Sequence, residues 1–187
     1  TNGIYYNIIS DTDKTVEVTY QNNYSKYSGD IVIPQFVNYN NTQYQVIRIG
    51  DYAFNSDDIT SVKLPEGLQE IGHDAFYSCD ALTNVELPEG LISIGSMAFC
   101  SCDALTNIEL PNSLEYISSS AFQNCSLTSI NLPNKITSIG GDAFSGCDIK
   151  SVTIPASVLH LYDNSFPSAK KIIFLGNTKP SEITNSI

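Results

Sequence analysis

One repeated stretch decides the fold of this chain: LTNVELPEGLISIGSMAFCSC, residues 82–102. Its Ala-Phe pair recurs at steps of 22 or 23 residues, and the last copy has Ser165 in place of the alanine. The recurring phenylalanines are Phe54, Phe76, Phe99, Phe122, Phe144 and Phe166. A unit of this length cannot bury its own apolar face, whereas stacked units bury one continuous core. The repeat therefore predicts a solenoid of 22–23-residue coils.

Each position of the unit has a physical role. Val85 and Leu87 alternate with Glu86, so we expect a short strand with two side chains inward and one outward. Gly95 predicts a tight corner that needs either a positive φ or a close approach of two backbones. The Ala-Phe pair predicts a single helical turn that points each phenylalanine into the core. The expected class is an α/β solenoid of short strands and single helical turns, with the phenylalanines as its spine.

The two ends depart from the repeat. Residues 4–9 and 16–20 alternate like strands around a polar turn, which predicts an N-terminal β-hairpin cap. A nine-residue insertion around residues 37–43 lengthens the first unit. We expect the cap and insertion to occupy residues 1–45, the repeat stack residues 29–176, and a polar tail residues 177–187.

Composition excludes several classes of function. The chain has 187 residues, 9 Lys and Arg against 20 Asp and Glu, and a net charge of −11, so it lacks the basic surface that nucleic-acid binding requires. No apolar run approaches the length of a membrane span. Because the chain starts at Thr1 without Met, we expect a processed or trimmed protein whose export signal, such as a lipid anchor, lies upstream.

The Leu-Pro, Ile-Gly, Ala-Phe and Cys positions together resemble the leucine-rich repeat of the BspA-like surface proteins of Bacteroides-type bacteria, spirochaetes and some protists. The resemblance covers about residues 29–176. It implies a right-handed, curved leucine-rich-repeat stack on a cell surface or secreted. It also implies adhesion to a host matrix protein, a glycan or another cell, without enzymatic activity. A structural spacer that presents a neighbouring domain is the alternative.

Four of the five cysteines share one repeat position: Cys79, Cys102, Cys125 and Cys147. Coils about 4.8 Å apart would spread their sulfurs along a line, which cannot surround one zinc ion. The spacing of neighbouring coils would permit disulfides between them. A ladder of buried thiols is nevertheless the favoured interpretation. Cys100 stands outside this column and is expected to be exposed. We expect no metal and no cofactor.

The histidines give little support for catalysis. His73 and His160 occupy different repeat positions, so they should not share a metal site. A hydrolase using the His73-Asp74 pair is the enzymatic alternative, but no nucleophile elbow such as Gly-x-Ser-x-Gly surrounds it. We therefore expect no catalytic residues.

Two surfaces compete as the binding site for an extracellular protein or glycan. Between Lys63 and Lys135 there are nine acidic residues and no Lys or Arg, which indicates either electrostatic steering or simple solubility. The outward strand columns form the default binding face; they are Ser61, Asn84, Asn107, Ser129 and Ser151, then Lys63, Glu86, Glu109, Asn131 and Thr153. The competing surface is the tyrosine-rich cap, with Tyr5, Tyr6, Tyr24, Tyr27 and Tyr39.

Overall fold

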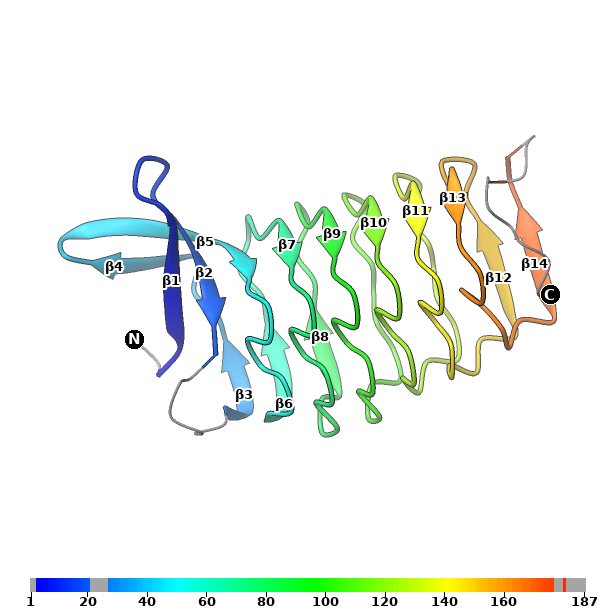
Figure 1. Cartoon of the computed structure of the whole chain (residues 1–187), viewed down its shortest axis with the longest axis horizontal. Helices are drawn as coiled ribbons and strands as arrows, with labels where there is room; N and C mark the ends of the chain where they lie inside the picture. Colours follow the sequence, from blue (N-terminus) through cyan, green and yellow to red (C-terminus); the bar gives the residue numbers. More distant parts are fainter. Residues whose placement is uncertain (1–2, 21–26, 177–179, 181–187) are drawn as a thin grey trace.

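A computed structural model describes residues 3–20, 27–176 and 180 of the chain. The repeats stack side by side in one row, from hairpins at the N-terminal end to β14 (Lys171–Phe174) at the other (Figure 1). Equivalent strands of successive coils pair in parallel. The repeat period of the sequence thus becomes the strand spacing of a parallel sheet.

Two sets of strands run along the row. Within the described residues the longer sheet has the order β1, β2, β5, β7, β9, β10, β11, β13, with β4 beside β5. Its strands are β1 (Tyr5–Ser10), β2 (Thr15–Thr19), β4 (Phe36–Tyr39), β5 (Thr42–Ile49), β7 (Glu70–Ile71), β9 (Ser93–Ile94), β10 (Tyr116–Ile117), β11 (Ser138–Ile139) and β13 (His160–Leu161). The second set pairs β3 (Ser28–Val32) with β6 (Asp58–Lys63) and β8 (Asn84–Glu86), and β12 (Ser151–Ile154) with β14.

The N-terminal hairpin forms where the sequence predicts it. Strands β1 and β2 pair antiparallel, and β2 then pairs in parallel with β5, so the hairpin continues the longer sheet. The insertion forms a second hairpin from β4 and β5. Its turn residues Asn40 and Asn41 both have positive φ, 48° and 61°, as a tight two-residue hairpin turn requires.

The predicted phenylalanine spine is confirmed. Successive rings from Phe54 to Phe166 stack with centroids 4.8–5.3 Å apart and planes within 10°. All six side chains are buried. At the N-terminal end the ring of Tyr27 packs on Phe54 at 5.0 Å. Tyr27 also accepts a hydrogen bond from the Tyr5 amide and donates one to the Thr19 carbonyl, so it joins the cap to the spine.

The expected helical turns do not form, and the described residues contain no helix. In the five coils from Phe54 to Phe144 the residues two before and two after the phenylalanine have left-handed backbone, as at Met97 (φ 55°) and Ser101 (φ 59°). The Phe99 amide donates to the Ala121 carbonyl of the next coil at 2.8 Å instead of closing a helical turn. The coils are therefore built from strands and β-turns, and the α component of the predicted class is wrong.

The glycine corner results from close backbone contact. A Cβ on Gly95 would lie 2.7 Å from the carbonyl carbon of Gly72, and Gly95 is not among the residues with positive φ. This contact leaves no room for a side chain at that corner without a shift of one backbone.

The cysteine column is a ladder of buried thiols, none of which forms a disulfide. Each thiol donates to the carbonyl of a phenylalanine in the preceding coil, at 3.0–3.2 Å. Burial raises the pKa of Cys102 and Cys125 well above the usual range of a thiol. The expectation that Cys100 is exposed is wrong, since its side chain is 5% exposed. The left-handed turn places its sulfur near Ser101 and Gln123.

Candidate functional site

The predicted binding columns lie on the outer face of the second set of strands. Ser61 pairs with Asn84 and Lys63 with Glu86, so the columns are in register there. Between β8 and β12 the chain keeps the same alternation of buried and exposed residues. Nine of the ten predicted residues are exposed and Ser61 is half-buried. We call this surface the strand face: Ser61, Lys63, Asn84, Glu86, Asn107, Glu109, Ser129, Asn131, Ser151 and Thr153.

The structure extends both columns by one coil at each end. Strand β3 adds Asp30 and Val32 beside β6, and β14 adds Lys171 and Ile173 beside β12. Sequence reasoning missed these four residues because it started the columns at the first regular repeat. The alternation of residues 28–32 and 171–174 is the signal that would have found them.

Polar groups at the N-terminal end of the strand face are already engaged. The hydroxyls of Thr60 and Ser61 donate to Asp30 Oδ1 at 2.8 and 2.7 Å, and these bonds lower the pKa of Asp30. Lys63 Nζ lies 3.6 Å from Glu86 Oε2. This end therefore offers few free hydrogen-bonding groups to a ligand.

A groove of about 390 Å³ lies at the C-terminal end of the strand face. Four predicted residues line it, Ser129, Asn131, Ser151 and Thr153, and Leu175 adds an exposed apolar wall. Within the described part of the chain, none of these four polar side chains has a hydrogen-bond partner. The groove thus combines free hydroxyl and amide groups with apolar surface, the composition typical of a small binding site.

The acidic tract does not form one surface. Glu86 and Glu109 lie on the strand face, but Glu70 contacts Arg48 at 3.0 Å on the longer sheet. Glu89 accepts hydrogen bonds from the backbone and side chain of Asn112 at a corner between the sheets. Dispersed over several sides, these charges favour solubility over a single steering surface.

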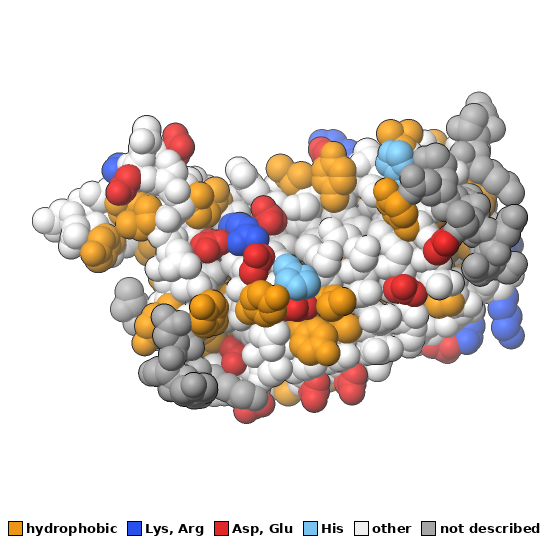
Figure 2. Space-filling view, viewed as in Figure 1, with side chains coloured by type: hydrophobic (Ala, Val, Ile, Leu, Met, Phe, Trp, Pro, Cys, Tyr) orange, Lys and Arg blue, Asp and Glu red, His pale blue; other side chains and the backbone are white. Residues whose placement is uncertain are grey.

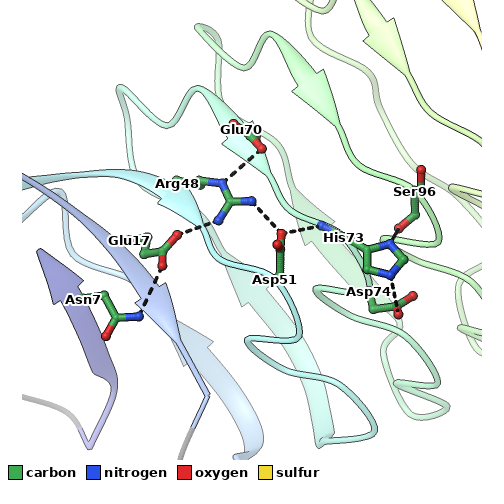
Figure 3. Close-up of polar contacts among 8 residues, drawn as sticks. All are labelled: Asn7, Glu17, Arg48, Asp51, Glu70, His73, Asp74 and Ser96. Carbon is green, nitrogen blue, oxygen red and sulfur yellow. Dashed lines mark hydrogen bonds and ion pairs between the residues drawn. The ribbon is translucent and has the colours of Figure 1, made fainter. Parts of the chain in front are cut away.

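Arg48 lies at the centre of an ion cluster on the longer sheet (Figure 3). Its guanidinium contacts Glu17 at 2.5 Å, Asp51 at 2.6 Å and Glu70 at 3.0 Å. Burial alone would lower the pKa of Arg48, but the hydrogen bonds to these carboxylates raise it in total. Asp51 also accepts the backbone N–H of His73 at 2.9 Å. The cluster links the N-terminal hairpin to the first coils, and sequence reasoning did not identify it.

His73 forms an ion pair with Asp74, and Asp74 acts electrostatically on the Cys100 thiol. His73 Nε2 lies 3.0 Å from Asp74 Oδ2, and Nδ1 lies 2.9 Å from the Ser96 carbonyl, so both ring nitrogens are engaged (Figure 3). Burial raises the pKa of the Cys100 thiol, which disfavours the thiolate. In the part of the chain described, no three His, Cys, Asp or Glu side chains are arranged to hold a metal ion.

The tyrosine-rich cap also contains a cavity. It has a volume of about 650 Å³, and its aromatic lining comes from Tyr5, Tyr6, Tyr39 and Tyr44. Burial raises the pKa of Tyr6 to about 12. Of the tyrosines expected here, Tyr27 belongs to the core instead, and Tyr24 lies outside the described residues.

Comparison with known proteins identifies the repeat. Residues 47–173 match the model of the BspA type leucine rich repeat region in six copies. No curated protein sequence matches significantly. Among the described residues, no helix has the length and apolarity that a bilayer span needs.

Three solved structures are similar over 95% of this chain. A leucine-rich repeat protein of Bacteroides ovatus is 28% identical with a TM-score of 0.72, over 52% of its own length. A leucine-rich repeat protein of T. pallidum is 28% identical with a TM-score of 0.81, over 81% of its length. A leucine rich cell surface protein of Faecalibacterium prausnitzii is 27% identical with a TM-score of 0.75, over 56% of its length.

The chain thus spans about half the length of the B. ovatus and F. prausnitzii proteins. The stacked coils, the phenylalanine spine and the six matched copies agree with one another. This chain belongs to the BspA-type leucine-rich repeat family.

Proposed function

We propose that this chain is a non-enzymatic binding or adhesion module of a cell-surface or secreted protein, and that it contacts its partner through the strand face. The observation that carries the proposal is the groove of about 390 Å³, whose polar lining residues have no partners within the described chain. The similar F. prausnitzii protein is a cell surface protein, which supports the location.

A partner of this surface would be recognised by polar contacts. The groove offers hydroxyl and amide groups from Ser129, Asn131, Ser151 and Thr153, with Leu175 and Ile173 as apolar walls. It contains no aromatic side chain, although aromatic residues dominate tight protein interfaces. This chemistry fits weak binding of an extracellular protein loop or glycan at several places better than it fits a tight one-to-one complex.

The test is a binding screen against matrix proteins, mucins and glycans. Ser151→Arg fills the groove and should abolish binding of the partner found with the unmodified chain. Thr12→Arg adds the same charge at the exposed tip of the β1–β2 hairpin and should leave binding unchanged. Glu86→Lys/Glu109→Lys reports whether the acidic part of the strand face also contributes.

Binding that survives in Ser151→Arg would contradict the strand face as the site. A chain that binds no member of the screen at two salt concentrations, with and without calcium, would favour a structural spacer instead.

A further inference from the structure

The longer sheet has an outer surface of its own, separate from the strand face. Its short strands place one outward residue per coil in register: Glu70, Ser93, Tyr116, Ser138 and His160. The corner that follows each strand holds a second column, which in the same coils is Gly72, Gly95, Ser118, Gly140 and Tyr162. Small residues fill most of these positions, so the tyrosines stand out from the repeat.

Tyr116 and Tyr162 lie in coils separated by a single coil, and that coil carries Ser138 and Gly140. Coils about 4.8 Å apart place the two flanking coils roughly 10 Å from each other. The small residues between them leave a cavity of about 310 Å³, and both tyrosines line it. Tyr116 and Tyr162, which both differ from the repeat consensus, therefore line the same cavity.

The lining supplies aromatic rings and free hydroxyls. Tyr116 and Tyr162 are 45% and 42% exposed. The remaining lining residues with polar side chains are serines: Ser96, Ser118, Ser119 and Ser138. Within the described part of the chain, none of these serine hydroxyls, nor the hydroxyl of either tyrosine, forms a hydrogen bond. Each hydroxyl can both donate and accept.

The charge of the site restricts the ligand. No lining residue is ionisable apart from the two tyrosines, and the surface over β9 and β10 is largely uncharged in Figure 2. The nearest histidine in this column is His160, whose ring centroid lies 6.4 Å from that of Tyr162. The chain as a whole carries a charge of −11, which disfavours sialylated, sulfated or phosphorylated ligands. These features favour a ligand that is neutral, rich in hydroxyl groups and flat enough to lie against an aromatic ring.

We infer that the cavity between Tyr116 and Tyr162 is a binding site for a neutral saccharide of one or two units. The apolar C–H face of a sugar ring packs on a tyrosine ring, which is apolar on its face and polar at its tip. The sugar hydroxyls exchange hydrogen bonds with the serines. The volume lies at the lower end of the range for small-molecule sites. This site is independent of the strand face.

The experiment uses the whole chain on an array of neutral and acidic mono- and disaccharides, followed by titration calorimetry with the best neutral sugar. Tyr116→Ala and Tyr162→Ala should each weaken binding at least tenfold. Tyr20→Ala removes a tyrosine of similar exposure (51%) outside the cavity and should bind as the unmodified chain does. Ser151→Arg should also bind normally, which separates this site from the groove of the strand face.

Circular dichroism of each variant confirms that it is folded. A second variant, Ser138→Arg, fills the cavity while both tyrosines remain, and it should also abolish binding. The inference is overturned if no neutral sugar binds, if only acidic sugars bind, or if Tyr20→Ala loses as much affinity as Tyr116→Ala.

Discussion

The rings of Phe76 and Phe99 lie parallel, with their centroids 5.0 Å apart and their planes at 2°. That distance is close to the spacing of about 4.8 Å between paired strands. Each coil therefore adds one strand to the sheet and one ring to the spine at nearly the same spacing. Because the thiols and the turn amides also bond from coil to coil, the same register is fixed on several sides of the core.

The phenylalanine spine predicts a large loss of stability on truncation. Phe99 is fully buried between two parallel rings, so Phe99→Ala should lower the free energy of unfolding by about 3–5 kcal/mol. Phe36→Ala is the control, because Phe36 is 43% exposed on the insertion hairpin, and it should cost less than about 1 kcal/mol. Denaturant titration measures both; equal losses would contradict the spine as the main source of stability.

The thiol ladder predicts protected cysteines. All five thiols are buried and none forms a disulfide, and burial raises the pKa of Cys102 and Cys125. A thiol reagent should therefore label none of the five in the folded protein, even at mildly alkaline pH, because the thiolate is the reactive form. After unfolding without reductant, five equivalents should react. A count of three or one would reveal disulfides between neighbouring coils.

The ion cluster around Arg48 predicts that the guanidinium of Arg48 stabilises the fold. Arg48→Met leaves Glu17, Asp51 and Glu70 close together without a positive charge, and should cost about 1–3 kcal/mol of unfolding free energy. Lys63→Met removes a cation from a pair whose side chains are 66% and 59% exposed, and should cost about 0–1 kcal/mol. Thermal denaturation at two salt concentrations compares them; equal effects would show that the cluster contributes nothing beyond an exposed pair.

Sequence periodicity predicted those features that each repeat determines by itself. The spacing of Phe76 and Phe99 predicted the spine, and the alternation around Glu86 predicted the exposed columns. The left-handed turns were missed because Met97 and Ser101 are not residues that normally indicate a positive φ. The backbone adopts it there since the turn amides bond to the next coil. Burial of Cys100 follows from the same turn.

Features that depend on contacts between unlike coils were beyond the sequence. Arg48 meets Glu17 only because β2 pairs in parallel with β5, and no repeat motif predicts that register. The cavity between Tyr116 and Tyr162 is lined by residues of four consecutive coils, so no single repeat predicts it. Residues that differ from the repeat consensus therefore indicate a site only when the structure shows which of them lie on neighbouring coils.

Asp74 makes a contribution to stability that becomes less favourable as pH rises. Burial raises its pKa, the nearby His73 partly opposes this, and Asp74 Oδ1 is buried without a hydrogen-bond partner in the described chain. The folded state thus binds the proton more tightly than the unfolded state, whose aspartate has a pKa of about 3.9. The ionised carboxylate accordingly destabilises the fold above that range, and protonation removes the penalty.

Asp74→Asn should therefore raise the free energy of unfolding at pH 7, and the gain should shrink toward zero as the pH falls below the ordinary range of an aspartate. Asn tolerates the left-handed backbone of this position (φ 51°). Asp142→Asn places asparagine at the equivalent turn position (φ 57°) and controls for the backbone effect. Urea titrations from pH 3 to pH 8 measure the difference between the variants, which should grow with pH. If Asp74→Asn destabilises the protein more at pH 7 than at pH 3, the attraction of His73 outweighs the cost of burying the carboxylate.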